Sequence, residues 1–162
     1  MKKGKKIHIL SDEIANKIAA GEVIERPASV VKELLENSID SGATEIFVEI
    51  ESAGKELIKI SDNGCGMTAE DAKKAFQRHA TSKLHEISDL ESIQTLGFRG
   101  EALPSIASVS KVLLATSHDE KMCGYEIKIE GGKGIFTREI ARPKGTTVEI
   151  REIFFNTPAR RK

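Results

Sequence analysis

The sequence predicts an α+β protein, a two-layer α/β sandwich in which a mostly antiparallel mixed sheet carries its helices on one face. Three observations lead to this prediction. Apolar residues recur at helical spacing within residues 11–20 and 27–41. Apolar and polar residues alternate within residues 44–61 and again after residue 111, as they do in half-buried strands. The glycine cluster at residues 131–134 is typical of a hairpin turn between two of the later strands.

The first two predicted elements are helices. The first lies within residues 11–20, where Ser11 or Asp12 can cap it, and Gly21 is expected to end it. Pro27 suits the first turn of a second helix, because its missing N–H would have no helical partner there. This helix is expected to run to about Ser41, with Gly42 as its stop.

A hairpin and a third helix are predicted next. Residues 44–51 and 57–61 are the two strands, and residues 53–55 form the turn between them. Thr68 then begins a helix that is expected to reach about Arg78, and Asp71 stands where a capping-box acid would be.

Residues 79–100 form a long polar connection, and such connections in compact domains are usually functional or mobile. A helix is predicted over residues 101–109, and the remainder is expected to be an antiparallel meander. Its candidate strands are residues 111–116, 124–130, 135–140 and 146–151.

Length and composition fit a single domain with its own core, over residues 1–162. The formal net charge is +0, so overall charge does not favour nucleic-acid binding, and any DNA contact would need a local patch. No apolar run is long enough for a membrane helix, and no signal peptide is recognisable, so we expect a cytoplasmic protein. Cys65 and Cys123 are not in a CxxC pair, which argues against a structural zinc site.

The second predicted helix carries candidate catalytic groups. Its apolar face, at about 100° per residue, is expected to comprise Val30, Val31, Leu34, Leu35 and Ile39. Glu36 and Asp40 point nearly opposite, toward water. Glu33 and Asn37 lie one turn apart at the edge of the apolar face, where they would line a cleft. Asn37 offers an oxygen to Mg²⁺, and Glu33 could deprotonate a water molecule; an ordinary polar helix edge is the alternative.

Asp62 stands at the end of a predicted strand and before two glycines. A carboxylate in this position can accept a hydrogen bond from the exocyclic amine of adenine. Gly64 and Gly66 would let the backbone approach a flat ring closely. A simple Asp-Asn-Gly turn is the alternative interpretation.

A second glycine-containing loop leads into the helix predicted at residues 101–109. Gly97 and Gly100 flank Phe98 and Arg99, and backbone amides at such a helix start can bind phosphate. The loop is neither the Walker A motif GxxxxGK[ST] nor the dinucleotide motif GxGxxG. Nucleotide binding here would therefore need a different architecture, and a glycine-rich connector is the alternative.

Several motifs together closely resemble the MutL family of DNA mismatch-repair proteins, which belongs to the GHKL ATPase superfamily with its Bergerat fold. They cover nearly the whole chain in the expected order. The motifs are Asn16 to Val23, Pro27 to Leu34, Glu36-Asn37-Ser38, Asp62-Asn63-Gly64-Cys65-Gly66, Arg78 to Lys83, Gly97 to Leu103 and Phe155 to Lys162.

The resemblance implies ATP as substrate, Mg²⁺ as cofactor and specific roles for residues. Glu33 matches the general base, Asn37 the magnesium-holding asparagine, and Asp62 the adenine-binding aspartate. The expected nucleotide-binding residues are Asn37, Asp62, Gly64, Gly66, Met67, Thr81, Ser82, Lys83, Leu96, Gly97, Phe98, Arg99, Gly100, Glu101, Ala102, Leu103, Thr146 and Thr147. Thr81, Ser82 and Lys83 match the lid over the nucleotide, and Gly97 to Leu103 match its phosphate-gripping part.

The resemblance also implies how a whole protein of this family works. ATP binding orders the lid and brings two N-terminal domains together as a homodimer, which gates contact with DNA and with a mismatch-recognition protein of the MutS type. A following domain supplies a lysine toward the terminal phosphate. Because the chain stops at Lys162, we expect a truncated piece with weak or no ATPase activity. Residues 1–11 are considered as a flexible arm, and the protein is expected to be bacterial and nucleoid-associated during repair.

The sequence leaves three alternatives to compare with this function. A topoisomerase or histidine-kinase domain of the same superfamily would not be expected to carry the Gly97 to Leu103 and Asn156 to Lys162 motifs together. A nucleotide-independent DNA-binding module is disfavoured by the neutral net charge and by the 4% aromatic content. A dimerisation module that uses residues 1–11 stays open as an added role.

Overall fold

The computed structural model describes residues 7–77 and 102–160. In this part of the chain one six-stranded sheet has the strand order β1-β2-β6-β3-β4-β5. Every neighbouring pair of these strands is antiparallel, so the parallel component implied by a mixed sheet is not found there. The strands are β1 (Ile46–Glu51), β2 (Leu57–Asp62), β3 (Lys111–Ser117), β4 (Cys123–Glu130), β5 (Lys133–Ala141) and β6 (Gly145–Arg151).

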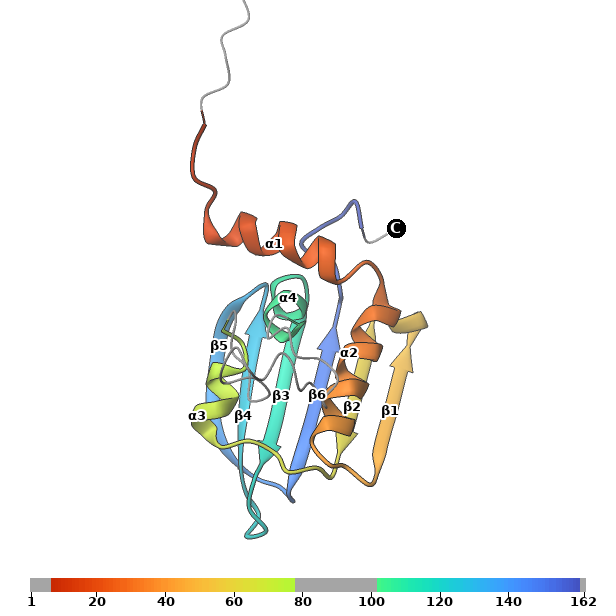
Figure 1. The fold of residues 1–162 in the computed structure, drawn as a ribbon, viewed down its shortest axis with the longest axis vertical. Coiled ribbons are helices and arrows are strands. Elements are labelled where there is room, and N and C mark those ends of the chain that lie inside the picture. Colours follow the sequence, from red (N-terminus) through yellow and green to blue (C-terminus); the bar gives the residue numbers. More distant parts are fainter. Residues whose placement is uncertain (1–6, 78–101, 161–162) are drawn as a thin grey trace, which may run out of the picture.

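The helices form a second layer on one face of the sheet, which confirms the predicted two-layer α+β fold (Figure 1). Helix α2 packs on β2, α3 packs on β4, and α1 crosses the end of the sheet against α4. The helices are α1 (Asp12–Val23), α2 (Pro27–Asp40), α3 (Ala69–Lys74), α4 (Ala102–Ser108) and the short 3₁₀ helix η1 (Ser52–Gly54) between β1 and β2. No helix among the described residues is long and apolar enough to cross a membrane.

The strand order differs from the predicted meander at one strand. Strands β3, β4 and β5 are consecutive neighbours, as expected, but β6 returns across the sheet and pairs between β2 and β3. Sequence alternation predicts that a strand exists and which of its side chains share a face. It does not predict a partner that is distant in the chain.

Helix α1 is longer than predicted, because Gly21 does not end it. The Ser11 side chain accepts a hydrogen bond from the Ile14 N–H, so the predicted cap is confirmed. The helix continues through Gly21 to Val23. A Cβ at Gly21 would lie 2.1 Å from a guanidinium nitrogen of Arg160. The glycine therefore lies beside the end of the Arg160 side chain.

Helix α2 has the predicted bounds within one residue, but its buried stripe is rotated from the predicted one. Val30, Leu34 and Ser38 are buried, and Ile39 is 56% exposed. At about 100° per residue, Ile39 lies about 140° from the centre of the buried stripe, so its assignment to the core face was wrong. Glu36, expected to point toward water, is half-buried and lies 3.9 Å from the Lys32 ammonium.

Most strand boundaries lie within two residues of the predicted ones, and larger differences occur at a helix and two turns. Helix α3 ends at Lys74, although its predicted cap is confirmed by the 3.1 Å hydrogen bond from the Asp71 N–H to Thr68 Oγ1. Residues 52–54 form a 3₁₀ helix instead of a simple turn. The later hairpin turns at Gly131 and Gly132 alone, and Lys133 already begins β5.

The sheet buries one face under the helices. The core rows pair Ile60 with Val148 and Ile58 with Ile150, and all four side chains are buried. Leu114 and Val112 extend these rows onto β3. Because strand side chains alternate, the residues between them lie on the opposite face. That open face carries charged groups such as Lys59 and Glu149.

We predict that Leu34→Ala destabilises the protein by about 2–5 kcal/mol, because the side chain is only 3% exposed and its removal leaves a cavity against the sheet. Ile39→Ala is the matched control on the same helix, and it should cost less than about 1 kcal/mol. Urea unfolding followed by circular dichroism measures both. Equal losses would contradict the observed rotation of the buried stripe.

Candidate functional site

A row of polar side chains crosses three adjacent strands on the helix-covered face. The strand register places Asp62 of β2 opposite Thr146 of β6, and Thr146 opposite Thr116 of β3. Thr116 and Thr146 hydroxyls are 2.9 Å apart. The row continues the core rows by one step, at the end where β2 finishes and β6 begins. It therefore forms the polar floor of the candidate site.

Asp62 is held from two sides. The Ser38 hydroxyl of α2 donates to Asp62 Oδ2 at 2.8 Å, and the Gly64 N–H donates to Oδ1 at 2.9 Å. The side chain is half-buried, and each carboxylate oxygen retains further lone-pair capacity beyond these single bonds. Asp62 is thus a fixed hydrogen-bond acceptor at the border of the core.

The glycines after Asp62 pack against the protein itself. A Cβ at Gly64 would lie 1.9 Å from Ser41 Oγ, and a Cβ at Gly66 would lie 1.8 Å from the Ser117 carbonyl oxygen. Gly66 also has φ +65°, a conformation that favours glycine. This packing explains both glycines without a ligand, and their predicted approach to a flat ring stays a prediction.

Met67 joins this loop to the floor of the site. Its N–H donates to Thr116 Oγ1 at 2.9 Å, and its side chain packs against the core. The loop after β2 is therefore fixed both to α2, through Ser38, and to β3, through Thr116.

Glu33 and Asn37 are half-buried on α2, as a position at the edge of the apolar face requires. They lie about 100° and about 60° from the centre of the buried stripe, on the side opposite to Ile39. Ser38, next to Asn37, is the residue that contacts Asp62. The helix thus brings a carboxylate, an amide and the anchored Asp62 to one region.

Thr146 and Thr147 were predicted as a pair, but they lie on opposite faces of the sheet. Thr146 shares the helix-covered face with Asp62, whereas Thr147 pairs with Ser61 on the open face, where the two hydroxyls are 3.0 Å apart. The alternation of strand side chains is the physical reason. The Thr147 side chain is therefore not part of the polar floor.

The remaining predicted residues are only partly covered by the structure. Ala102 and Leu103 are half-buried at the start of α4. The other predicted lid residues lie outside the described residues: Thr81, Ser82, Lys83, Leu96, Gly97, Phe98, Arg99, Gly100 and Glu101.

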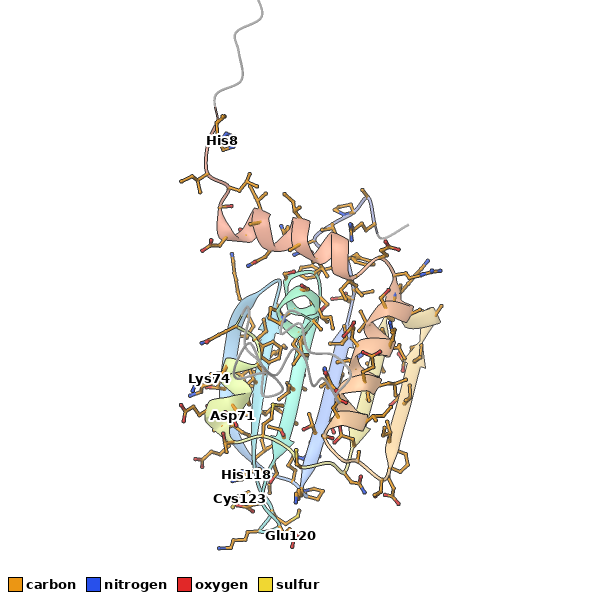
Figure 2. All side chains as sticks on the ribbon, viewed as in Figure 1. His8, Asp71, Lys74, His118, Glu120 and Cys123 are labelled. Atoms are coloured by element: carbon orange, nitrogen blue, oxygen red, sulfur yellow. The ribbon has the colours of Figure 1, made fainter. Side chains whose placement is uncertain are left out.

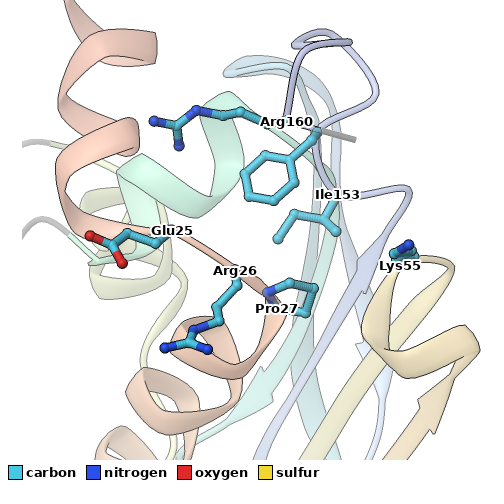
Figure 3. Close-up of a pocket in the computed structure, with 7 residues that line it drawn as sticks. Glu25, Arg26, Pro27, Lys55, Ile153 and Arg160 are labelled. Carbon is cyan, nitrogen blue, oxygen red and sulfur yellow. The ribbon is translucent and has the colours of Figure 1, made fainter. Parts of the chain in front are cut away.

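A pocket elsewhere on the surface does not coincide with this site. Figure 3 shows it at the N-terminal end of α2, whereas Ser38 and Asp62 lie toward the other end of that helix. None of its lining residues was predicted as a site residue. They are Glu25, Arg26, Pro27, Lys55, Ile153, Phe154 and Arg160.

Sequence reasoning missed two residues of the site, Ser38 and Thr116. Ser38 follows Val30 and Leu34 at four-residue spacing, which is the signal that could have identified it as buried. Thr116 alternates with the buried residues Val112 and Leu114, so its face was predictable. The contact of Thr116 with Thr146 was not predictable, because it depends on the pairing of β6 with β3.

Comparisons with known proteins agree with this fold and these motifs. Residues 24–152 match the model of the histidine kinase-, DNA gyrase B- and HSP90-like ATPase family. The chain is 61% identical over 157 residues to the DNA mismatch repair protein MutL of Solibacter usitatus, and 59% identical over 158 residues to that of Clostridium botulinum. These alignments cover 97% and 98% of the chain. The chain spans about a quarter of the length of these relatives, since each is covered to 24%.

Solved structures show the same architecture. The Aquifex aeolicus MutL ATPase domain in complex with ADP superposes with a TM-score of 0.68 at 41% identity, covering 86% of this chain and 47% of that one. The N-terminal domain of a DNA repair protein superposes with a TM-score of 0.75 at 33% identity, covering 91% and 41%. The resemblance found in the sequence is thereby confirmed. The chain belongs to the histidine kinase-, DNA gyrase B- and HSP90-like ATPase family, and within it to the ATPase domains of the MutL type.

Proposed function

We propose that this chain binds ATP with its adenine ring at Asp62. The observation that carries the proposal is the double anchoring of the Asp62 carboxylate by Ser38 Oγ and the Gly64 N–H. These donors hold the carboxylate in one orientation, so it can accept a hydrogen bond from the 6-amino group of adenine without reorganising. The similar Aquifex aeolicus domain is described as a complex with ADP, which supports a nucleotide as the ligand.

The phosphates would lie toward Glu33 and Asn37 on α2. The Asn37 side chain fits a magnesium ion, because Mg²⁺ prefers oxygen ligands and usually keeps few protein contacts beside phosphate and water. When bound, the ion would neutralise charge on the phosphates. Glu33, one turn from Asn37 and half-buried, is proposed as the base that orients and deprotonates the attacking water. Ala102 and Leu103 begin α4 and are proposed, with residues 96–101, to contact the phosphates.

In the whole protein, we propose that Mg-ATP binding orders the lid and promotes pairing of two N-terminal domains. The relatives named above are DNA mismatch repair proteins, which supports a role in that process for the longer polypeptide. Homodimerisation, contact with DNA and contact with a MutS-type protein belong to this proposal. ATP binding would then act as the signal that shifts the protein between unpaired and paired states.

We predict that Asp62→Asn raises the Kd for ATP at least about tenfold. The Gly64 N–H can only donate, so it would keep the amide oxygen of the asparagine at the Oδ1 position, and the NH₂ group would replace Oδ2 beside Ser38. The adenine amine would then meet an N–H donor in place of one carboxylate oxygen, and the remaining acceptor oxygen would carry no charge. Calorimetric titration with ATP, with and without magnesium, measures the effect. Asp71→Asn is the matched control, because Asp71 lies on α3, away from β2 (Figure 2). Equal Kd values for unaltered and Asp62→Asn protein would refute the adenine assignment.

We predict that Glu33→Gln lowers the ATP hydrolysis rate by about 10²–10⁴-fold while the Kd for ATP changes less than about threefold, because a neutral amide cannot accept the proton of water. Phosphate release under saturating ATP measures the rate, and calorimetry measures the Kd. Glu36→Gln is the control on the same helix, and it should retain the full rate. A Glu33→Gln protein that hydrolyses ATP normally would exclude Glu33 as the base.

We also predict that this chain hydrolyses ATP more slowly than a polypeptide that continues through the next domain of a MutL relative. The expected reason is the additional lysine that the longer polypeptide brings to the terminal phosphate, where it stabilises developing negative charge. Single-turnover phosphate release from both polypeptides tests this. Equal rates would show that the present chain already contains all the groups that hydrolysis needs.

A further inference from the structure

Arg142 lies behind the polar floor of the site, on the open face of the sheet. Its Nη1 donates to the Ala115 carbonyl oxygen at 2.6 Å and to Thr147 Oγ1 at 3.3 Å, and its Nε donates to the Pro143 carbonyl oxygen at 2.9 Å. Ala115 belongs to β3 and Thr147 to β6. One guanidinium group therefore ties together two neighbouring strands and the segment that precedes β6.

The fold leaves a specific passage for this side chain. Arg142 crosses β4 at Gly124, where a Cβ would lie 2.6 Å from Arg142 Cγ and 2.8 Å from the Thr116 carbonyl oxygen. Any larger residue at position 124 would displace the arginine or the strand. The Arg142 side chain is half-buried in this passage and lies across the back of the site strands.

The contacts of Arg142 lead directly to Asp62. Thr147, which accepts from Arg142, is 3.0 Å from the Ser61 hydroxyl, and Ser61 immediately precedes Asp62. Gly145, at the start of β6, packs so closely on Asp62 that a Cβ there would lie 2.0 Å from the Asp62 carbonyl oxygen. Burial lowers the pKa of the Arg142 guanidinium, and the negative charge of Asp62 acts in the opposite direction.

We propose that Arg142 is a positioning residue for base recognition: from the open face it ties β3 to the start of β6. Through Thr147 and Ser61 it also holds the end of β2, so that Asp62 meets the 6-amino group of adenine. This inference rests on the proposed function, because it assumes that Asp62 binds adenine. Arg142 itself does not touch the nucleotide. Its contribution should therefore affect the part of the binding energy that depends on the 6-amino group.

The test compares two nucleotides and measures both Kd values by calorimetry. ATP carries the 6-amino group, and the triphosphate of purine riboside lacks it. We expect Arg142→Met to raise the Kd for ATP about tenfold and to leave the Kd for the purine riboside triphosphate within about twofold, so that the preference for ATP is lost. Arg142→Lys keeps the positive charge but lacks the planar guanidinium group with its several N–H donors. We expect the logarithm of the ratio of the two Kd values to fall to about half in this variant. Arg138→Met is the matched control, because Arg138 is an exposed arginine of β5 that pairs with Glu126.

Each outcome decides between the two proposals. If Asp62→Asn abolishes the preference for ATP but both Arg142 variants keep it, the positioning role is wrong and the proposed function stands. Loss of affinity for both nucleotides in equal proportion would mean that Arg142 only stabilises the fold, and it would overturn the inference. If the Arg142→Met protein does not fold, the nucleotide preference of Arg142→Lys decides alone. If the unaltered protein binds neither nucleotide, or shows no preference that Asp62→Asn removes, the proposed function fails and this inference fails with it.

Discussion

The pairing of β6 between β2 and β3 is the constraint on which the rest of the structure depends. This register places Thr146 beside Asp62 and Thr116, and it gives the buried rows of β2 and β3 a shared neighbour. Without β6, the sheet would separate into the β1–β2 hairpin and the β3–β4–β5 meander. The site lies at this junction, where β6 joins the β1–β2 hairpin to the β3–β4–β5 meander. The strand ends there provide polar groups beside an apolar core.

The two layers are joined at the same place by a polar contact. Ser38 occupies the third position of the buried stripe of α2, where the preceding positions hold Val30 and Leu34. A hydroxyl at that point would be costly if it had no partner, and Asp62 supplies the partner at 2.8 Å. The hydrogen bond therefore fixes both the rotation of α2 and the orientation of the carboxylate. Because Glu33 and Asn37 are on the same helix, their positions depend on the same contact.

Local patterns in the sequence predicted most elements and the main candidate residues, and the failures have physical causes. Helix caps at Ser11 and Thr68 were predictable because a cap depends on neighbouring residues only. The prediction that Gly21 ends α1 was wrong because a glycine is tolerated inside a helix that tertiary packing supports, and α1 packs on α4. Ile39 was assigned to the core because the spacing of apolar residues predicts that a helix has a buried face, but it does not fix which residue lies at the centre of that face. Asp62 was predictable from its place at a strand end before two glycines. Alternation in the predicted strand over residues 146–151 separates Thr146 from Thr147, but only the strand register shows that Thr146 is the one beside Asp62.

The glycines of the Asp62-Asn63-Gly64-Cys65-Gly66 motif meet two requirements at once. Gly64 contacts Ser41 of the chain that follows α2, and Gly66 contacts Ser117 at the end of β3, so both are needed to close the fold around Asp62. A substitution at either glycine would change the fold and the site together, and its effect on nucleotide binding could not be assigned to one cause. Residues that act on only one side of the sheet are more informative. Arg142 is such a residue. It contacts Ala115 of β3 and Thr147 of β6 from the open face, whereas Asp62, Thr116 and Thr146 of the polar floor lie on the helix-covered face.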